Sequence, residues 1–283
     1  MVVFNIITNM PLEYEAIRNS FNAVARQYEE NAILQKEVLA RLLERLEDEQ
    51  NLDVNFRPTH LVDLGCGTGW AAPELLKIYP ELKISAVDFS QSMLDEVKNK
   101  ASVELICADV HDLPFADNSV DIVFSNMLLH WSNEKDVFSE ARRVLKPGGL
   151  LLMSCLGETS LVELKQAWLN VDKKSHVHNF PALHDLGDDL LNKGFAEVVV
   201  NAEIITLTYE DVVALMKDIK ASGGHNSNEG RAKGLMSKAQ LELLTKGYEV
   251  FREENRLPAS YEVIYLRAKK PELKSAINLT IKE

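Results

Sequence analysis

One short run near residue 65 restricts the possible folds of this chain more than any other feature. From Asp63 to Gly69 it reads Asp-Leu-Gly-Cys-Gly-Thr-Gly, and it follows an apolar run and precedes a helix-like stretch at 70–79. Glycine has no Cβ, so this backbone can approach a ligand closely and adopt unusual dihedral angles. A strand, a glycine turn and a helix in this order predict a nucleotide-binding α/β unit.

The spacing and charge of the turn narrow the choice of ligand. Its glycines alternate at Gly65, Gly67 and Gly69, Asp63 stands two residues before the first, and no phosphate-binding Gly-Lys pair follows. An acid at a strand end suits a cationic ligand better than a pyrophosphate, because opposite charges attract. The ligand that we infer is S-adenosylmethionine, whose amino group and sulfonium are both positively charged.

Acids also close the next two strand-like runs. The run 83–87 ends at Asp88, about 20 residues beyond the glycine turn, where a carboxylate commonly accepts the ribose hydroxyls. The run 103–108 ends at Asp109, which could accept the adenine amino group. Such acids can also be ordinary helix caps, but three at consecutive strand ends favour a ligand site. The cofactor contacts predicted at these two strand ends are Asp88, Phe89, Met93, Asp109 and Val110.

Two further runs, at 121–126 and 150–155, continue the alternation of strands and helices. With them, residues 57–155 resemble the class I S-adenosylmethionine-dependent methyltransferases. The resemblance implies an α/β fold with a Rossmann-like seven-stranded sheet, mostly parallel, with helices on both faces and a final antiparallel strand. It also implies S-adenosylmethionine as the cofactor.

Two helical segments lie outside this sheet. The first covers 13–28 and 31–50. The second lies between strand-like runs at 198–207 and 261–266, with helices expected at 209–220 and 237–254. Helices inserted before the last strand would stand above the carboxyl edge of the sheet and form a lid over the substrate. The expected parts are an N-terminal helical cap (1–56), a cofactor-binding core (57–208), a helical lid insertion (209–258), and the last core strand with a tail (259–283).

Composition limits the partners and the location. A net charge of −12 disfavours a nucleic-acid binder, which needs a basic face. The apolar runs are only strand-sized, and the first ten residues lack the features of a signal peptide, so neither a membrane span nor secretion is expected. Cys66, Cys107 and Cys155 fall in or beside expected strands and are interpreted as reduced core thiols. A cytoplasmic protein without a metal site is therefore expected.

A second resemblance reaches far beyond the core, from about residue 14 to 266. It is carried by Phe21-Asn22, Tyr28, Leu34-Gln35, Ser125-Asn126, Trp131, His178-x-Phe180, Leu215-Met216, Glu229-Gly230-Arg231 and Leu257-Pro258-Ala259-x-Tyr261. These residues resemble the malonyl-acyl-carrier-protein O-methyltransferases of the biotin pathway. The resemblance implies methyl transfer from S-adenosylmethionine to the free carboxylate of a malonyl thioester, on an acyl carrier protein or on coenzyme A. The product would be the methyl ester that primes synthesis of the biotin precursor.

One departure from that family keeps other functions open. His130-Trp131 stands where the family often has glutamine before the tryptophan. With Gly157–Thr159 and Asp185–Gly187, this pair also resembles the mitochondrial arginine hydroxylase that helps assemble respiratory complex I. The alternatives are another enzyme that uses this cofactor, or a cofactor-binding protein without catalysis.

The implied reaction makes simple demands on the site. A carboxylate with a pKa of roughly 4 is already ionised at neutral pH, so no general base is needed. Catalysis would then depend mainly on positioning, with a cation to hold the carboxylate. The candidates for contact with the reacting groups are Tyr28, Arg143, Lys220 and Arg231.

Each of these candidates also has a structural interpretation. Tyr28 could point its hydroxyl at the reacting groups or pack between helices, and Arg143 could hold substrate or pair with Glu140 on its own helix. Gln35 could bind the cofactor carboxylate or lie on the surface, and Asn126 is also expected in the cofactor site.

The remaining candidates concern the substrate and its carrier. Lys220 and Arg231 could meet the malonyl carboxylate or a carrier phosphopantetheine, or they could be solvated. Acyl carrier proteins are strongly acidic, so an acidic enzyme needs a local basic dock. His130 could hydrogen-bond the substrate or simply pack beside Trp131. The candidates for the basic dock are Lys217, Lys220, Arg231, Lys233 and Lys238.

Overall fold

A computed structural model of the chain describes residues 13–53, 55–97, 100, 102–224 and 236–272. Seven strands form one sheet in the order β3-β2-β1-β4-β5-β7-β6, in which β7 runs antiparallel to both neighbours and the other pairings are parallel. The predicted mixed sheet is therefore confirmed. Its strands are β1 (His60–Leu64), β2 (Lys83–Asp88), β3 (Glu104–Cys107), β4 (Val120–Asn126), β5 (Leu145–Leu156), β6 (Ala196–Tyr209) and β7 (Leu257–Lys269).

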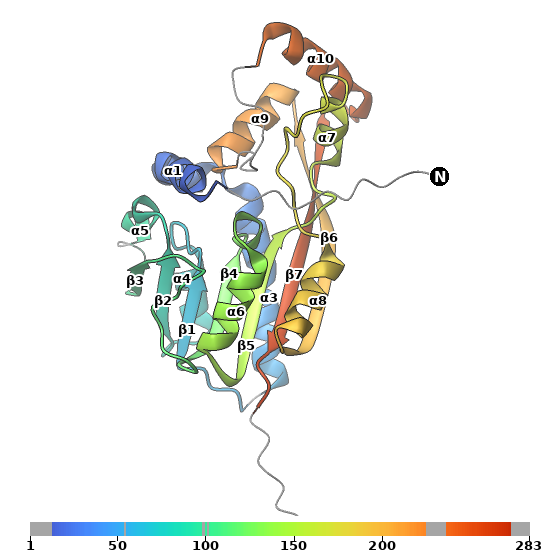
Figure 1. Cartoon of the computed structure of the whole chain (residues 1–283). Coiled ribbons are helices and arrows are strands. Elements are labelled where there is room, and N and C mark those ends of the chain that lie inside the picture. Colours follow the sequence, from blue (N-terminus) through green and yellow to red (C-terminus); the bar gives the residue numbers. More distant parts are fainter. Residues whose placement is uncertain (1–12, 54, 98–99, 101, 225–235, 273–283) are drawn as a thin grey trace, which may run out of the picture.

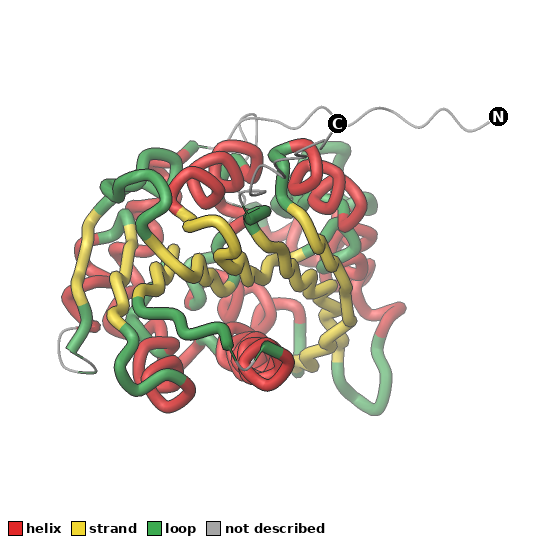
Figure 2. The backbone as a smooth tube through the Cα atoms, turned by 90° about the horizontal axis from the view of Figure 1, so that it is seen from below, coloured by secondary structure: helices red, strands yellow, loops and turns green. Residues whose placement is uncertain are grey.

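Helices cover both faces of this sheet (Figure 2). Successive residues of a strand point to opposite faces, so each strand supplies both halves of the core. Leu61 of β1 packs with Leu42 and Leu75 on one face, and its neighbour Val62 packs with Phe138 on the other. The helices are α1 (Tyr14–Val24), α2 (Tyr28–Asn31), α3 (Ile33–Leu52), α4 (Ala71–Ile78), α5 (Gln91–Val97), α6 (Glu134–Val144), α7 (Val162–Trp168), α8 (Leu183–Asn192), α9 (Val212–Ala221) and α10 (Lys238–Tyr248).

The helices expected between the last two strands are present. Along the chain, α9 and α10 come between β6 and β7, and they lie with α1 and α7 beyond the carboxyl ends of the parallel strands (Figure 1). The Ser20 hydroxyl of α1 donates to the carbonyl oxygen of Gly223 at 3.1 Å, which joins the N-terminal segment to the end of α9. The action of these helices as a lid, and the domain boundaries, stay predictions.

Several local expectations need correction. The helix expected at 13–28 is interrupted by a 3-10 turn (Ala25–Gln27) before α2, and that interruption lets Tyr28 begin a new helix. The helix expected through residue 254 ends at Tyr248, followed by a 3-10 turn at Glu249–Phe251. Only Cys155 is a core thiol, because Cys66 is half-buried and Cys107 is exposed. Cys107 ends β3, which is an edge strand of the sheet formed by the described residues.

No helix among the described residues combines the length and the apolar character needed to cross a bilayer.

Gly69 provides a test of the turn's packing. Its φ is +80°, and a Cβ added there would lie 2.7 Å from Cγ1 of Val97. We expect Gly69→Ala to lower the free energy of unfolding by about 1–3 kcal/mol, because both the backbone and the contact are strained. The matched change Gly187→Ala, within α8, adds a Cβ at an ordinary 3.5 Å from Val200 and is expected to raise stability by about 0.5–1 kcal/mol. Urea unfolding measures both changes in the free energy of unfolding. Equal changes in the two variants would contradict the close packing of the glycine turn against Val97.

Candidate active site

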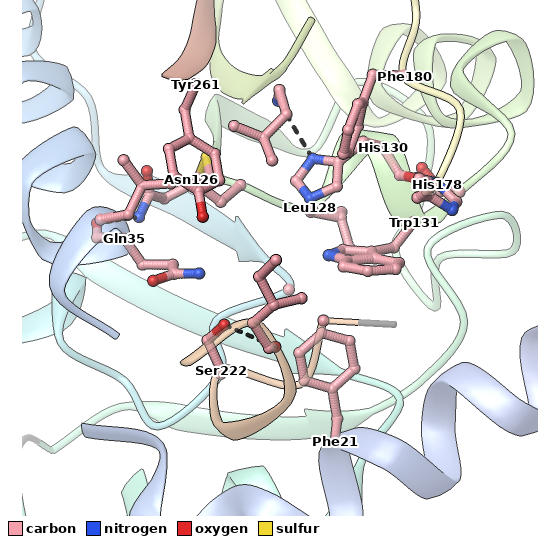
Figure 3. Close-up of a pocket in the computed structure, with 18 of the residues that line it drawn as sticks. Phe21, Gln35, Asn126, Leu128, His130, Trp131, His178, Phe180, Ser222 and Tyr261 are labelled. Carbon is pink, nitrogen blue, oxygen red and sulfur yellow. Dashed lines mark hydrogen bonds between the residues drawn. The ribbon is translucent and has the colours of Figure 1, made fainter. Parts of the chain in front are cut away.

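A cavity of about 260 Å³ opens at the carboxyl ends of the parallel strands. The glycine turn after β1, the end of β2 and the segments after β3 and β4 all contribute to its walls. Phe21 of α1, Tyr28 of α2 and Ile219 of α9 line it from the added helices. Figure 3 shows the side chains around this space, with Tyr261 and Gln35 on one side and His130 and Trp131 on the other.

The glycine turn is held against the neighbouring strand. The backbone N–H groups of Gly65 and Cys66 donate to the carbonyl oxygen of Val87 at 2.8 and 3.0 Å. A Cβ at Gly65 would lie 2.8 Å from Cδ1 of Leu128, so a side chain there would force the turn out of place. Gly65 and Gly67 line the cavity, as predicted positions for cofactor contact should. Gly69 packs on Val97 instead and does not line it, so a cofactor contact of Gly69 stays a prediction.

Asp63 is a buried acid whose Oδ2 has no hydrogen-bond partner among the described residues. Its side chain lines a smaller cavity of about 40 Å³, which shares Tyr28, Gln35 and Asn126 with the larger one. Burial, and then the nearby charge of Asp88, raises the pKa of Asp63 to about 8. A buried carboxylate without a partner is costly, and a cationic ligand in this cavity would supply the missing interaction. The ammonium group of S-adenosylmethionine fits this requirement.

Asp88 already holds the glycine turn in shape. Its Oδ2 accepts from the N–H of Gly67 at 3.0 Å, and its Oδ1 accepts from the N–H of Ser90 at 2.8 Å. A carboxylate offers about four acceptor positions, so two are left for the hydroxyls of a ribose. Burial raises the pKa of Asp88 to about 6, against the opposing effect of these two hydrogen bonds. Phe89 and Met93 also line the cavity, next to this carboxylate in the chain.

Asp109 and Val110 also line this cavity. The His111 ring is orientated, because its Nε2 accepts from the N–H of Asn133 at 3.1 Å. Its Nδ1 therefore carries the proton and donates to Oδ1 of Asp109 at 2.5 Å. This arrangement keeps the carboxylate of Asp109 at the edge where the adenine amino group was predicted.

Asn126 connects the sheet to the N-terminal segment. Its Nδ2 donates to the carbonyl oxygen of Gln35 at 3.0 Å, and its Oδ1 accepts from the Ser154 hydroxyl at 2.8 Å. Gln35 and Tyr28 line both cavities. Burial, with a smaller effect from Asp88, raises the pKa of Tyr28 far above its usual value, so its hydroxyl stays protonated.

Arg143 is not brought to the cavity. Its guanidinium pairs with both carboxylate oxygens of Glu140 and donates to the carbonyl oxygens of Leu113 and Phe115 and to Asp117. These contacts use its donors to tie the segment before β4 to α6. They match the structural interpretation of this residue, because all of its N–H donors have partners within the protein.

The other predicted cations are also absent from the described walls. Lys220 is exposed on α9 and does not line the cavity, although its neighbour Ile219 does. Arg231 lies outside the described residues. Among the described residues that line the cavity there is no lysine and no arginine.

The cavity also has an aromatic wall, and the sequence did not predict that its residues would lie together. His130 and Trp131 form its base, and His178 and Phe180 reach it from the irregular segment between α7 and α8. The only signal for the second pair was the His178-x-Phe180 motif of the family resemblance, which does not specify a contact. Within the described part of the chain, no group of histidines, cysteines and acids could hold a metal ion.

Solved structures share this fold at low sequence identity. The YcgJ protein from Bacillus subtilis superimposes with a TM-score of 0.57 at 17% identity, covering 83% of this chain and all of that one. A phosphoethanolamine N-methyltransferase from Haemonchus contortus, solved with S-adenosylhomocysteine, gives 0.53 at 18% identity and covers 90% of this chain and 60% of that one. At these identities the likeness concerns the fold alone.

The sheet, the glycine turn and the three strand-end acids define a class I S-adenosylmethionine-dependent methyltransferase, and residues 62–153 match the methyltransferase domain family. A malonyl-[acyl-carrier protein] O-methyltransferase from Gallionella capsiferriformans is 42% identical over 271 residues, which cover 92% of each chain. One from Laribacter hongkongensis is 38% identical over 90% of this chain and 89% of its own. The chain belongs to the family of malonyl-[acyl-carrier protein] O-methyltransferases, and its cofactor is S-adenosylmethionine.

Proposed function

We propose that this protein methylates the free carboxylate of a malonyl group carried as a thioester by an acyl carrier protein, in the pathway to biotin. The observation that supports this most is the extent of the similarity to enzymes named for that reaction. It covers 92% of the chain, whereas the methyltransferase domain alone matches residues 62–153. The similarity therefore includes added helices, such as α9, that line the cavity beside the cofactor turn.

The described walls of the cavity suit a nucleophile that is already ionised. Bound S-adenosylmethionine supplies an activated methyl group. A carboxylate oxygen forms the new carbon–oxygen bond while the methyl–sulfur bond breaks, so no proton has to move. Apolar side chains such as Leu128, Leu156 and Ile219 exclude water from this space and favour a fixed approach. Tyr28, protonated at neutral pH, is suited to donate a hydrogen bond near the reacting groups.

Docking of the carrier protein is expected to depend on α9. Lys217 and Lys220 are exposed on this helix, and Met216 and Ile219 of the same helix line the cavity. A carrier that approaches the cavity from this side would bring its acidic surface to these lysines. Arg231 and Lys233 belong to the same predicted dock, although they lie outside the described residues.

Charge reversal of α9 tests this dock. We expect the double variant Lys217→Glu, Lys220→Glu to raise the KM for malonyl carrier protein about 10-fold, more at low salt, because like charges then face the carrier. The affinity for S-adenosylhomocysteine should be unchanged. The control variant Lys77→Glu, Lys83→Glu changes the net charge equally on α4 and at the start of β2, and it should leave KM within about twofold. Equal effects of the two variants would contradict a local dock.

Genetic complementation tests the proposed function as a whole. A strain that requires biotin because it lacks malonyl carrier methylation should grow without biotin when it expresses this chain. The Asp63→Asn variant, expressed at the same level, should not support growth. Failure of the well-expressed natural chain would contradict the proposal.

A further inference from the structure

His130 occupies a central position in the aromatic wall. It lies in the 3-10 turn Leu129–Trp131, which begins after β4 ends at Asn126, and it lines the cavity with only 5% of its surface exposed. In Figure 3 its ring stands across the cavity from Gln35. The sequence alone left two roles open for this residue, a packed aromatic ring or a hydrogen bond to substrate.

The hydrogen bond to its ring determines where the proton of His130 lies. The backbone N–H of Leu156, the last residue of β5, donates to Nδ1 of His130 at 3.3 Å (Figure 3). An accepting Nδ1 carries no proton, so the neutral ring carries it on Nε2. Among the described residues, Nε2 has no hydrogen-bond partner. Because His130 lines the cavity, this N–H group is available to an acceptor on a ligand bound there.

Neighbouring side chains hold this ring in place. His178 donates from its Nε2 to the carbonyl oxygen of His130 at 2.7 Å. The rings of Trp131 and Phe180 lie 5.0 and 5.7 Å from the His130 ring, measured between centroids. The donor is therefore preorganised, and little side-chain entropy has to be lost when it binds an acceptor.

The substrate brings a negative charge into a cavity whose described walls contain no lysine or arginine. Asp88, Asp109 and Asp218 line the same space, so the carboxylate depends on nearby donors to be held there. A neutral N–H donor can orient one oxygen of the carboxylate and leave its charge for the attack on the methyl group. Burial, with a smaller contribution from His178, holds the pKa of His130 well below its usual value, which keeps the ring neutral at neutral pH.

We infer that His130 is a substrate-binding residue whose Nε2–H donates a hydrogen bond to a carboxylate oxygen of the malonyl group. This inference rests on the proposed function, since it names the residue that recognises the charged end of that substrate. It also predicts selectivity, because an acyl group of similar length without the carboxylate gains nothing from this donor.

Two substitutions separate this role from simple packing. His130→Phe retains an aromatic ring but has no donor, whereas His130→Gln retains a neutral N–H. Steady-state kinetics with malonyl carrier protein should show that His130→Phe loses about 10- to 100-fold in kcat/KM, the range for a lost hydrogen bond to a charged group. The glutamine variant should stay within about fivefold of the natural protein.

Binding measurements provide the selective readout. His130→Phe should weaken binding of malonyl carrier protein but leave the affinities for butyryl carrier protein and S-adenosylhomocysteine unchanged. An equal loss for malonyl and butyryl carriers, or full activity of the phenylalanine variant, would overturn the inference. If the natural protein itself fails to methylate malonyl carrier protein, the proposed function is wrong. That result is obtained without the variants and is therefore distinct from a failure of the inference about His130.

Discussion

Replacing Asp63 with asparagine is expected to weaken S-adenosylmethionine binding about 100-fold, because a buried charge that pairs with the cationic ligand is lost. The substitution keeps the shape of the side chain, and the loss should therefore come from charge alone. Calorimetric titration with S-adenosylmethionine measures the change directly. Because the free protein holds Asp63 largely protonated at neutral pH, binding should also release a proton into the buffer.

The same variant should make the free protein more stable at neutral pH. In the folded state the pKa of Asp63 is about 8, above its unfolded value of 3.8. The folded state then binds more protons than the unfolded state between these values, so stability falls as the pH rises from about 4 to about 8. Asparagine does not titrate, so the free energy of unfolding of the variant should lose this part of its pH dependence. Near pH 7 that free energy should be a few kcal/mol higher than in the natural protein. Urea unfolding of the free protein across this pH range tests the sign.

Asp121 on the neighbouring strand β4 is the matched control. Its Oδ2 accepts from the N–H of Thr59 at 2.9 Å and from the N–H of His60 at 3.0 Å, and its Oδ1 pairs with Lys146 at 2.7 Å. Although burial acts in the opposite direction, these partners hold the pKa of Asp121 below its usual value. Asp121→Asn should therefore lower stability at neutral pH without weakening cofactor binding. A stabilised Asp121→Asn, or a destabilised Asp63→Asn with intact cofactor affinity, would contradict the assignment of Asp63.

Asp88→Ala is expected to weaken cofactor binding by about 100-fold or more, because it removes the predicted ribose acceptor and releases the glycine turn. The N–H groups of Gly67 and Ser90 lose their acceptor in this variant. The two unpaired N–H groups should also lower the free energy of unfolding by about 2–4 kcal/mol. Calorimetry with S-adenosylhomocysteine and urea unfolding measure the two effects on the same protein.

Ser90→Ala provides the control for that variant. The Ser90 hydroxyl donates to Asn22 at 2.7 Å, but the hydrogen bond to Asp88 comes from its backbone N–H and survives the change. We expect cofactor affinity to stay within about threefold of the natural protein. If Asp88→Ala and Ser90→Ala weakened cofactor binding equally, the loss could not be assigned to the carboxylate of Asp88. It would instead reflect the loss of the contacts that join Asp88, Ser90 and Asn22.

The part of the cavity wall that is proposed to bind the cofactor was predictable because its residues are close together in sequence or at strand ends. Asp63 and the glycines are adjacent in sequence. Asp88 ends β2 and Asp109 follows the end of β3, and the parallel pairing of these strands brings both acids to one edge of the sheet. The prediction needed only the strand order of a known fold and the chemistry of carboxylates. The unpartnered Oδ2 of Asp63 and the bonds of Asp88 to the turn required the structure.

The aromatic wall that is proposed to meet the substrate depends on contacts between segments that are distant in sequence. His178 meets the carbonyl group of His130 across 48 positions, and no periodicity in the irregular segment between α7 and α8 indicates that pairing. Arg143 had a plausible charge for holding a carboxylate, yet Glu140 on its own helix and the carbonyl groups of a nearby segment bind it first. Composition could not distinguish these outcomes, because they depend on which partners lie within reach.

Methyl transfer in a purified system tests the central claim most directly. The protein is incubated with S-adenosylmethionine labelled in the methyl group and with malonyl carrier protein, and the label on the carrier is followed before and after mild base. We predict one methyl group per malonyl group, present as a base-labile ester and absent when butyryl carrier protein replaces the malonyl form. A protein that binds the cofactor but puts no label on the malonyl carboxylate would contradict the proposed reaction.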